Sequence, residues 1–148
     1  MSSLTIFIPA RSGSMRIKNK NLQKLGKISL LDRKIKICKS LKIGNVVVST
    51  NSKKIAKLSI KNGAEIPFLR PEKYSTSKAS TVSTILHYLR FLKKNNKIIP
   101  TYLAILPLTN PFLKKKTIIS AYKKIVKNKK INSIIGFTEA NDHPFTFI

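Results

Sequence analysis

The segment from position 8 to position 22, IPARSGSMRIKNKNL, gathers the residue types best suited to chemistry in this chain. Arg11, Arg16 and Lys20 supply positive charge, serine hydroxyls lie beside them, and Gly13 allows a ligand to approach the backbone closely. Such a loop suits the oxygens of a polyphosphate. Its spacing fits neither the lysine-bearing Walker A pattern nor GxGxxG. We therefore predict a phosphate site here, with a solvated basic surface loop as the alternative interpretation.

Acidic side chains are too few for a carboxylate-based centre. The chain has 30 Lys and Arg residues against 5 Asp and Glu, which gives a formal net charge of +25. The acidic residues are Asp32, Glu65, Glu72, Glu139 and Asp142. We predict no metal ligand in this set, because a carboxylate cage or a dense acid–base site needs more of them close together. The single cysteine, Cys38, excludes an internal disulfide, fits a reducing cytosol, and is expected to pack in the core.

The excess of positive charge predicts weak, salt-sensitive attraction to any polyanion, including RNA and membrane surfaces. It does not predict specificity, because most of the basic residues are lysine and the four tyrosines are scattered rather than clustered for base stacking. The N-terminus lacks the layout of a signal peptide, and no apolar run approaches the ~18 residues of a spanning helix. We expect a soluble, cytoplasmic protein without a specific nucleic-acid or membrane partner.

The elements that must position the loop alternate between short apolar runs and longer segments of helical spacing. Strands are predicted at 4–8, 45–49, 64–69, 102–106 and 133–137, and helices at 30–41, 53–62, 80–95 and 114–128. This order predicts one α/β domain over 1–148, with a mostly parallel, Rossmann-like sheet and helices on both faces in three layers. The basic loop follows the first strand, at the edge of the sheet where such folds bind ligands.

The loop sequence IPARSGSMRIKNKNL closely resembles the signature of the acylneuraminate cytidylyltransferases, the CMP-sialic acid synthetases and their relatives for other nonulosonic acids. Further matches follow in the family's order: VVVSTNSKKIAKLSIKNGAEIPFLRP, KASTVSTILHYL and the stretch from Glu139 to Pro144. The resemblance implies a fold of the nucleotide-diphospho-sugar transferase type. It also implies transfer of CMP from CTP to the anomeric hydroxyl of a nine-carbon α-keto sugar acid, with release of pyrophosphate.

The resemblance also implies roles for individual residues. Arg11 and Lys20 would grip the triphosphate and act in catalysis. The implied nucleotide-binding set is Ala10, Arg11, Gly13, Ser14, Lys20, Asn21, Arg70, Ala79 and Thr81, and the implied sugar-binding residues are Thr109 and His143. His87, within a helical pattern, is expected to be a packed or partly exposed side chain rather than a catalytic base.

The chain also departs from the family's pattern. Asn51 and Ser77 stand where relatives usually have aspartate, Pro107 replaces a glutamine that would contact the sugar acid, and Leu113 replaces an arginine. Family members continue beyond the length of this chain, and that portion carries the Mg²⁺-binding aspartates, much of the sugar pocket and a dimerisation element. We therefore expect the Mg²⁺ ligands there, a homodimer for the full-length parent, and little transferase activity from the 148 residues alone.

Two classes of alternative remain open. One is a nucleotidyltransferase of the same fold that acts on another sugar or an alditol, which base preference at the 79–81 region would distinguish. The other is a protein without turnover, either a truncated relative that holds nucleotide or a basic module that binds RNA. Few carboxylates favour the truncated relative, whereas sparse aromatic residues and few arginines argue against the RNA module.

Overall fold

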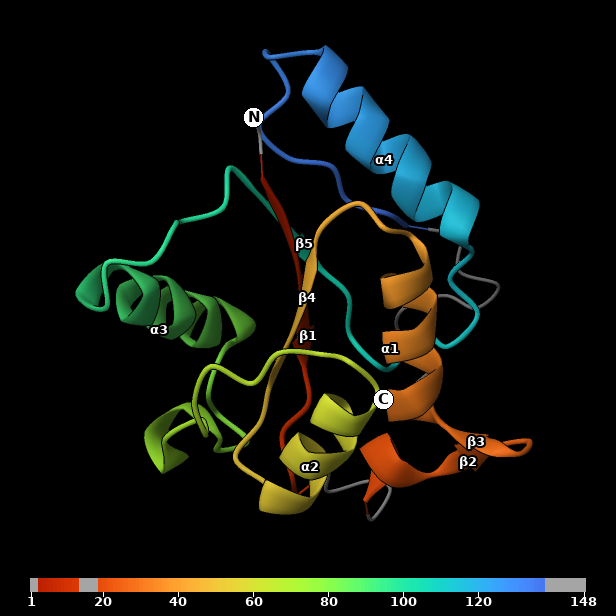
Figure 1. Ribbon diagram of the computed structural model, residues 1–148, viewed down its shortest axis with the longest axis vertical. Helices are drawn as coiled ribbons and strands as arrows, with labels where there is room; N and C mark the ends of the chain where they lie inside the picture. Colours follow the sequence, from red (N-terminus) through yellow and green to blue (C-terminus); the bar gives the residue numbers. More distant parts are fainter. Residues whose placement is uncertain (1–2, 14–18, 138–148) are drawn as a thin grey trace, which may run out of the picture. The chain divides into compact units, whose positions relative to one another are not determined.

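The computed structural model describes residues 3–13 and 19–137 of the chain. The chain divides into two compact units, Met1–Lys115 and Lys116–Ile148, and each is described by itself. A single domain over 1–148 stays a prediction. The first unit is built on a parallel sheet of three strands, β1 (Leu4–Pro9), β4 (Asn45–Ser49) and β5 (Tyr102–Ile105), in the order β4-β1-β5 (Figure 1). The three strand predictions are confirmed to within a residue at each end.

The central strand, β1, is apolar on both faces, and the sheet is covered on both. Ile6 pairs in register with Val46 of β4 and with Ala104 of β5. Ile6, Phe7 and Ile8 are fully buried. A strand that alternated apolar and polar residues would leave one face in water, whereas this continuous apolar run is typical of a parallel sheet between two helical layers.

One face of the sheet packs against α3 (Thr81–Lys94), as Figure 1 shows. Phe7 and Val47 form a buried cluster with Tyr88 and Leu92 of this helix. The rings of Phe7 and Tyr88 lie 5.4 Å apart between centroids. Ser80 begins the helix, because its hydroxyl accepts a hydrogen bond from the backbone N–H of Ser83 at 3.0 Å.

The opposite face carries α1 (Leu30–Ser40) and α2 (Lys53–Lys61), which completes the predicted three layers (Figure 1). Buried side chains of α1 and α2 include Leu31, Ile35 and Ile55. Ser52 caps α2, because its hydroxyl accepts a hydrogen bond from the backbone N–H of Ile55 at 3.3 Å. Gly63 follows α2 with φ 81°, the left-handed conformation that commonly ends a helix.

The strand predicted at 64–69 is wrong in extent. Only Glu65 pairs, in an isolated parallel bridge to Val47. Pro67 has no N–H for a ladder. Beyond the bridge the chain returns to the sheet edge at Arg70, whose backbone N–H donates to the Thr50 carbonyl at 2.7 Å. This path brings the Arg70 side chain to the end of β4.

The second unit contains α4 (Lys115–Lys127), where a helix is predicted, followed by irregular chain. The strand predicted at 133–137 is wrong. Ile135 and Phe137 are 80% and 95% exposed, and the described part of this unit, 116–137, holds no other strand for the segment to pair with. Hydrogen bonds to a neighbour are what make an apolar run a strand.

Several short elements are absent from the sequence-based prediction. A two-residue pair, β2 (Lys24–Leu25) and β3 (Ile28–Ser29), forms an antiparallel hairpin around Gly26, which has φ 69°. Two 3-10 turns, η1 (Lys20–Leu22) and η2 (Glu72–Tyr74), flank the site described below. Among the described residues, no helix is long and apolar enough to cross a membrane.

Candidate functional site

A cavity of about 600 Å³ opens at the carboxyl ends of the parallel strands. Its wall is drawn from four places: the loop after β1, the turn before α3, the start of α3, and the segment after β5. The lining residues are Pro9, Arg11, Lys20, Asn21, Arg70, Ser77, Ala79, Thr81, Thr84, Pro107, Leu108 and Thr109. This edge of the sheet is where open α/β folds bind ligands, because loops there leave successive strands without crossing the sheet.

Arg70 is fixed into the cavity wall by the backbone around it. Its Nε donates to the Ser49 hydroxyl at 3.1 Å, one terminal nitrogen donates to the Ser49 carbonyl, and the other donates to the Tyr74 carbonyl at 3.3 Å. The residue is 5% exposed. Burial, together with the smaller effect of the positive charge of Arg11, lowers the pKa of Arg70 to about 10. The cavity therefore contains a rigid cation beside a second cation, an environment that an anion would relieve.

Arg11 lies opposite, on the loop after β1, and is half-buried. Its Nη1 is 3.5 Å from both the Gly13 and the Ser75 carbonyl oxygens. The carbonyl of Arg11 accepts from the Asn21 side-chain amide at 2.7 Å. Asn21 is 8% exposed and belongs to η1, so it ties the return of the loop to its start. Lys20 precedes it and lines the cavity.

The structure brings together seven of the residues that the sequence analysis names for the site. They line the same cavity: Arg11, Lys20, Asn21, Arg70, Ala79, Thr81 and Thr109. Ala10 is fully buried, and its backbone N–H donates to the Ser49 carbonyl at 2.9 Å, so it extends the pairing of β1 instead of lining the cavity. Ser14 and His143 lie outside the described residues. The functional role of each residue stays a prediction.

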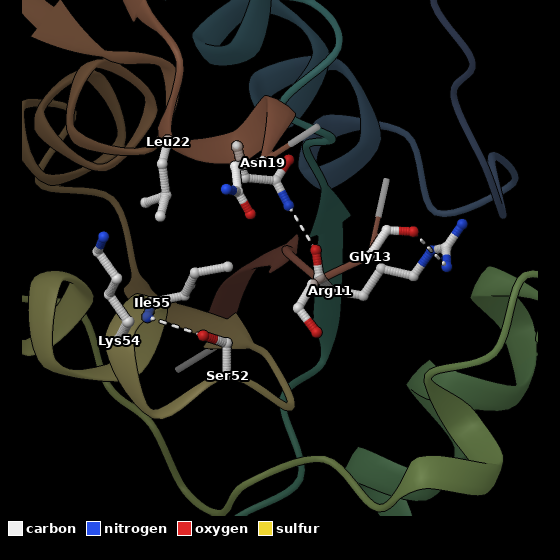
Figure 2. Close-up of a pocket in the computed structure, with 9 residues that line it drawn as sticks. Arg11, Gly13, Asn19, Leu22, Ser52, Lys54 and Ile55 are labelled. Carbon is white, nitrogen blue, oxygen red and sulfur yellow. Dashed lines mark hydrogen bonds between the residues drawn. The ribbon is translucent and has the colours of Figure 1, made fainter. Parts of the chain in front are cut away.

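Gly13 lines a second, smaller cavity of about 110 Å³ (Figure 2). Ser52, Lys54 and Ile55 at the start of α2 form its other side. Asn51, which stands where relatives usually have aspartate, fixes the loop beside it: its side-chain oxygen accepts from the Ser12 backbone N–H at 2.9 Å and from the Ser12 hydroxyl at 3.1 Å. A neutral amide oxygen therefore suffices to hold the loop after β1 to the end of β4.

Three cavity residues have no part in the sequence-based site: Pro9, Leu108 and Thr84. Thr84 lies one helical turn after Thr81, so its place on the same face of α3 could have been found from the i, i+3 spacing. Its hydroxyl donates to the Ser80 carbonyl at 3.2 Å. Ser77 and Pro107, two of the departures from the family's pattern, also line the cavity.

No carboxylate is among the residues that line either cavity in the described part of the chain. Asp32 accepts a hydrogen bond from the Asn62 side chain at 2.7 Å, and Glu65 pairs with β4 through its backbone. Within 3–13 and 19–137, no group of three His, Cys, Asp or Glu side chains could hold a metal ion.

The described histidine and the cysteine lie apart from the cavity, in agreement with their expected packing roles. His87 is half-buried, with its ring 4.7 Å from that of Phe68 and 4.5 Å from that of Tyr74, between centroids. Its Nδ1 is buried without a hydrogen-bond partner. Cys38 is 1% exposed, and burial raises the pKa of its thiol to about 11.

Known proteins resemble this chain in sequence and in fold. It is 34% identical to CMP-N,N'-diacetyllegionaminic acid synthase of Legionella pneumophila, over 75% of this chain and 48% of that protein. A pseudaminic acid cytidylyltransferase of Campylobacter jejuni is also 34% identical, over 87% of this chain and 55% of that protein. The structure of CMP:2-keto-3-deoxy-manno-octonic acid synthetase complexed with CTP superimposes with a TM-score of 0.71 at 15% identity, over 86% of this chain and 49% of that one.

The chain spans about half the length of these relatives. The structural match carries the fold alone, a parallel α/β sheet of the nucleotide-diphospho-sugar transferase type, and confirms that prediction. The family model described as "Cytidylyltransferase" matches residues 5–144. That match covers both the loop after β1 and every segment that lines the larger cavity, and by it the chain belongs to the cytidylyltransferase family.

Proposed function

We propose that this chain forms the CTP-binding part of a cytidylyltransferase that activates a nonulosonic acid, converting CTP and the sugar acid to CMP-sugar and pyrophosphate. The observation that carries the proposal is the convergence of Arg11, Lys20 and Arg70 on one cavity whose described lining has no carboxylate. Three cations without a counter-ion match the charge of a triphosphate. The names of the relatives, which include legionaminic and pseudaminic acid enzymes, supply the acceptor class.

The chemistry needs positioning and charge rather than a covalent intermediate. The anomeric hydroxyl of the sugar acid attacks the α-phosphorus of CTP and gives up its proton to water. The bond from that phosphorus to the oxygen that bridges it to the β-phosphate breaks, and negative charge moves onto the leaving pyrophosphate. Arg11 and Lys20 offset that charge, an effect that is larger in a partly dry cavity than in water. Arg70 is tied to the Ser49 and Tyr74 carbonyls, so it keeps its place as the charge moves.

The two ends of the cavity divide the substrates between them. Ala79 and Thr81, at the start of α3, border the cytidine, and Asn21 holds the loop that carries Arg11. Thr109, from the segment after β5, faces the sugar acid in this proposal. We assign Ser14 to the nucleotide site and His143 to the sugar site, and Gly13 allows the nucleotide to approach the loop backbone closely. Residues 1–148 then act as one nucleotidyltransferase domain.

Magnesium and a second subunit belong to the same proposal. When bound, Mg²⁺ would neutralise part of the charge of the triphosphate. Because the described residues do not form a carboxylate site, we place its ligands in the half of the relatives that this chain does not span. A homodimer of the full-length parent and a cytoplasmic location are further parts of the proposal.

A second candidate is a relative that holds CTP without turnover. It is favoured by the neutral residues Asn51 and Ser77, which stand in place of aspartates, and by the lack of a carboxylate in the described lining. A pyrophosphate-release assay with CTP, Mg²⁺ and several nonulosonic acids separates the two. Turnover by the full-length parent supports the enzyme, and CTP binding by that parent without release of pyrophosphate supports the second candidate.

Calorimetry tests the nucleotide site that both candidates share. We expect CTP with Mg²⁺ to bind more tightly than ATP or GTP. Arg11→Ala and Lys20→Ala should each weaken CTP binding by about 1–3 kcal/mol, the value of one charge-assisted contact. Lys57→Ala removes the same charge from an exposed position on α2 and serves as the control. Equal affinity for all four nucleotides, or equal losses in all three variants, would leave only non-specific attraction of polyanions.

A further inference from the structure

Two consecutive cations on α1 reach across to the segment that follows β5. Lys34 Nζ donates to the Asn110 carbonyl at 2.5 Å, and Arg33 Nε donates to the Pro111 carbonyl at 3.3 Å. The Arg33 guanidinium carbon also lies 6.0 Å from the centre of the Phe112 ring. Figure 1 shows this teal segment running beside α1, in orange. We call residues 107–112 the β5 loop.

The β5 loop also forms one wall of the larger cavity, through Pro107, Leu108 and Thr109. Its first part is anchored by the sheet, because Leu106 N–H donates to the Phe7 carbonyl at 3.0 Å and Leu108 is 3% exposed. Prolines at 107 and 111 remove two backbone donors from this short loop. The hydrogen bonds from α1 are made to backbone carbonyl groups of the β5 loop, just after the residues that line the cavity.

Burying the charged side chain of Lys34 costs free energy, which suggests that its hydrogen bond has a structural role. The side chain is 3% exposed, and burial lowers the pKa of its ammonium group. Cys38, one turn along the helix, is a neutral thiol near neutral pH because burial raises its pKa to about 11. An apolar side chain of similar volume generally fills a buried position at lower cost than a cation. The hydrogen bond to Asn110 fixes one arrangement of the β5 loop, which an apolar side chain would not do.

We propose that Lys34, assisted by Arg33, is a positioning residue for the sugar-acid end of the cavity. The pair fixes the β5 loop so that Thr109 and its neighbours meet the acceptor, whereas CTP is held by the loop after β1, by Arg70 and by the start of α3. No residue of α1 lines the cavity in the described part of the chain, so the effect passes through the β5 loop. This inference rests on the proposed function.

Separate titrations of the two substrates test it. Wild-type chain and variants are titrated with CTP in EDTA, and then, saturated with CTP in EDTA, with pseudaminic acid and N-acetylneuraminic acid. Lys34→Met keeps the apolar stem and removes the donor. We expect it to weaken binding of the acid that the wild type prefers by about tenfold, as for a displaced positioning group. CTP affinity should stay within about twofold, because that end loses no contact.

Lys36→Met is the matched control, since Lys36 lies on the same helix, is exposed, and carries the same charge. It should change neither affinity. If Lys34→Met does not fold, Arg33→Met tests the same loop, because Arg33 is only half-buried. We expect this variant also to lose affinity for the acid and to keep its affinity for CTP. Hydrogen exchange of the peptide covering 106–113 should rise in Lys34→Met and not in Lys36→Met, which shows that the loop itself has moved.

The outcomes separate this inference from the proposed function. Failure of wild type to bind CTP overturns the proposed function and the inference with it. CTP binding with no binding of either acid, equal losses for CTP and acid in Lys34→Met, or acid binding unchanged in Lys34→Met each overturns the inference alone. A selective loss of acid affinity, together with faster exchange in the β5 loop, supports it.

Discussion

Replacing Arg70 by methionine separates the structural and the ligand-binding contributions of one side chain. The guanidinium makes three hydrogen bonds, to the Ser49 hydroxyl, the Ser49 carbonyl and the Tyr74 carbonyl. Bonds to a charged group contribute about 1.5–3 kcal/mol each, and carbonyls left buried without a donor lose that stabilisation. Against this, the lowering of the Arg70 pKa to about 10 corresponds to a cost of about 3 kcal/mol for keeping the charged form buried.

The difference between these opposing effects gives the expected change in the free energy of unfolding. We expect Arg70→Met to lower the free energy of unfolding by about 1.5–6 kcal/mol, since the lost hydrogen bonds outweigh the relieved burial cost. Urea denaturation followed by circular dichroism measures it, with the slope m checked for two-state behaviour. Lys20→Ala, at a half-buried residue of the same cavity, should change stability by no more than about 0.5 kcal/mol.

The refuting result is specific. If Arg70→Met unfolds at the wild-type urea midpoint, the guanidinium does not hold the end of β4 and η2 together. CTP affinity measures the ligand-binding role of Arg70 independently of stability, because Arg70 and Lys20 both line the cavity. Both variants should weaken CTP binding, although only Arg70→Met should also destabilise the fold. A variant that loses stability and binds CTP normally would show that Arg70 is only structural.

Two further predictions concern His87 and Cys38. Burial lowers the pKa of His87, and the charges of Lys73, Arg70 and Arg90 lower it further. Because the folded-state pKa lies below the ordinary value of 6.5, stability from the neutral ring is complete above that pH and is lost as the pH falls below it. His87→Phe should therefore show a smaller fall in urea midpoint between about pH 7 and pH 5 than wild type, and an identical fall would contradict this. Burial raises the pKa of Cys38 to about 11, so its reaction with a thiol reagent at about pH 8 should be slow in the native chain and fast in denaturant. Rapid reaction of the native chain would show that the helix opens easily.

Continuous apolar runs and helix caps explain why the sheet and its helices could be predicted. The runs at β1 and β4 are apolar on both faces, and a serine precedes each of α1, α2 and α3. The segment 64–69 is also rich in apolar residues, yet it pairs at one residue only, because Pro67 has no donor and the chain turns to bring Arg70 to the end of β4. The local sequence pattern does not predict where the chain turns back to the sheet.

The site shows the same division between local and distant information. Residues of the loop after β1 could be named because they are adjacent in sequence and chemically alike. The contact between Lys34 and Asn110 could not, since 76 positions separate the two residues and a lysine in a basic chain is expected to be solvated. Thr84 was within reach of a spacing argument, because it repeats the position of Thr81 one turn further along α3.

The charge distribution of the cavity supports the proposed nucleotide site in a chain with few acidic residues. Arg11 lowers the pKa of Arg70, so the two cations repel each other before a ligand is present. A triphosphate replaces that repulsion with attraction to both, which makes the free energy of binding depend on the number of phosphates more than on any single contact. Pro107 and Leu108 leave the opposite wall without charge. In the proposed function, the polarity of the cavity therefore orients CTP with its phosphates toward the loop after β1, and the β5 loop is left to discriminate among acceptors by shape and by the hydroxyl of Thr109.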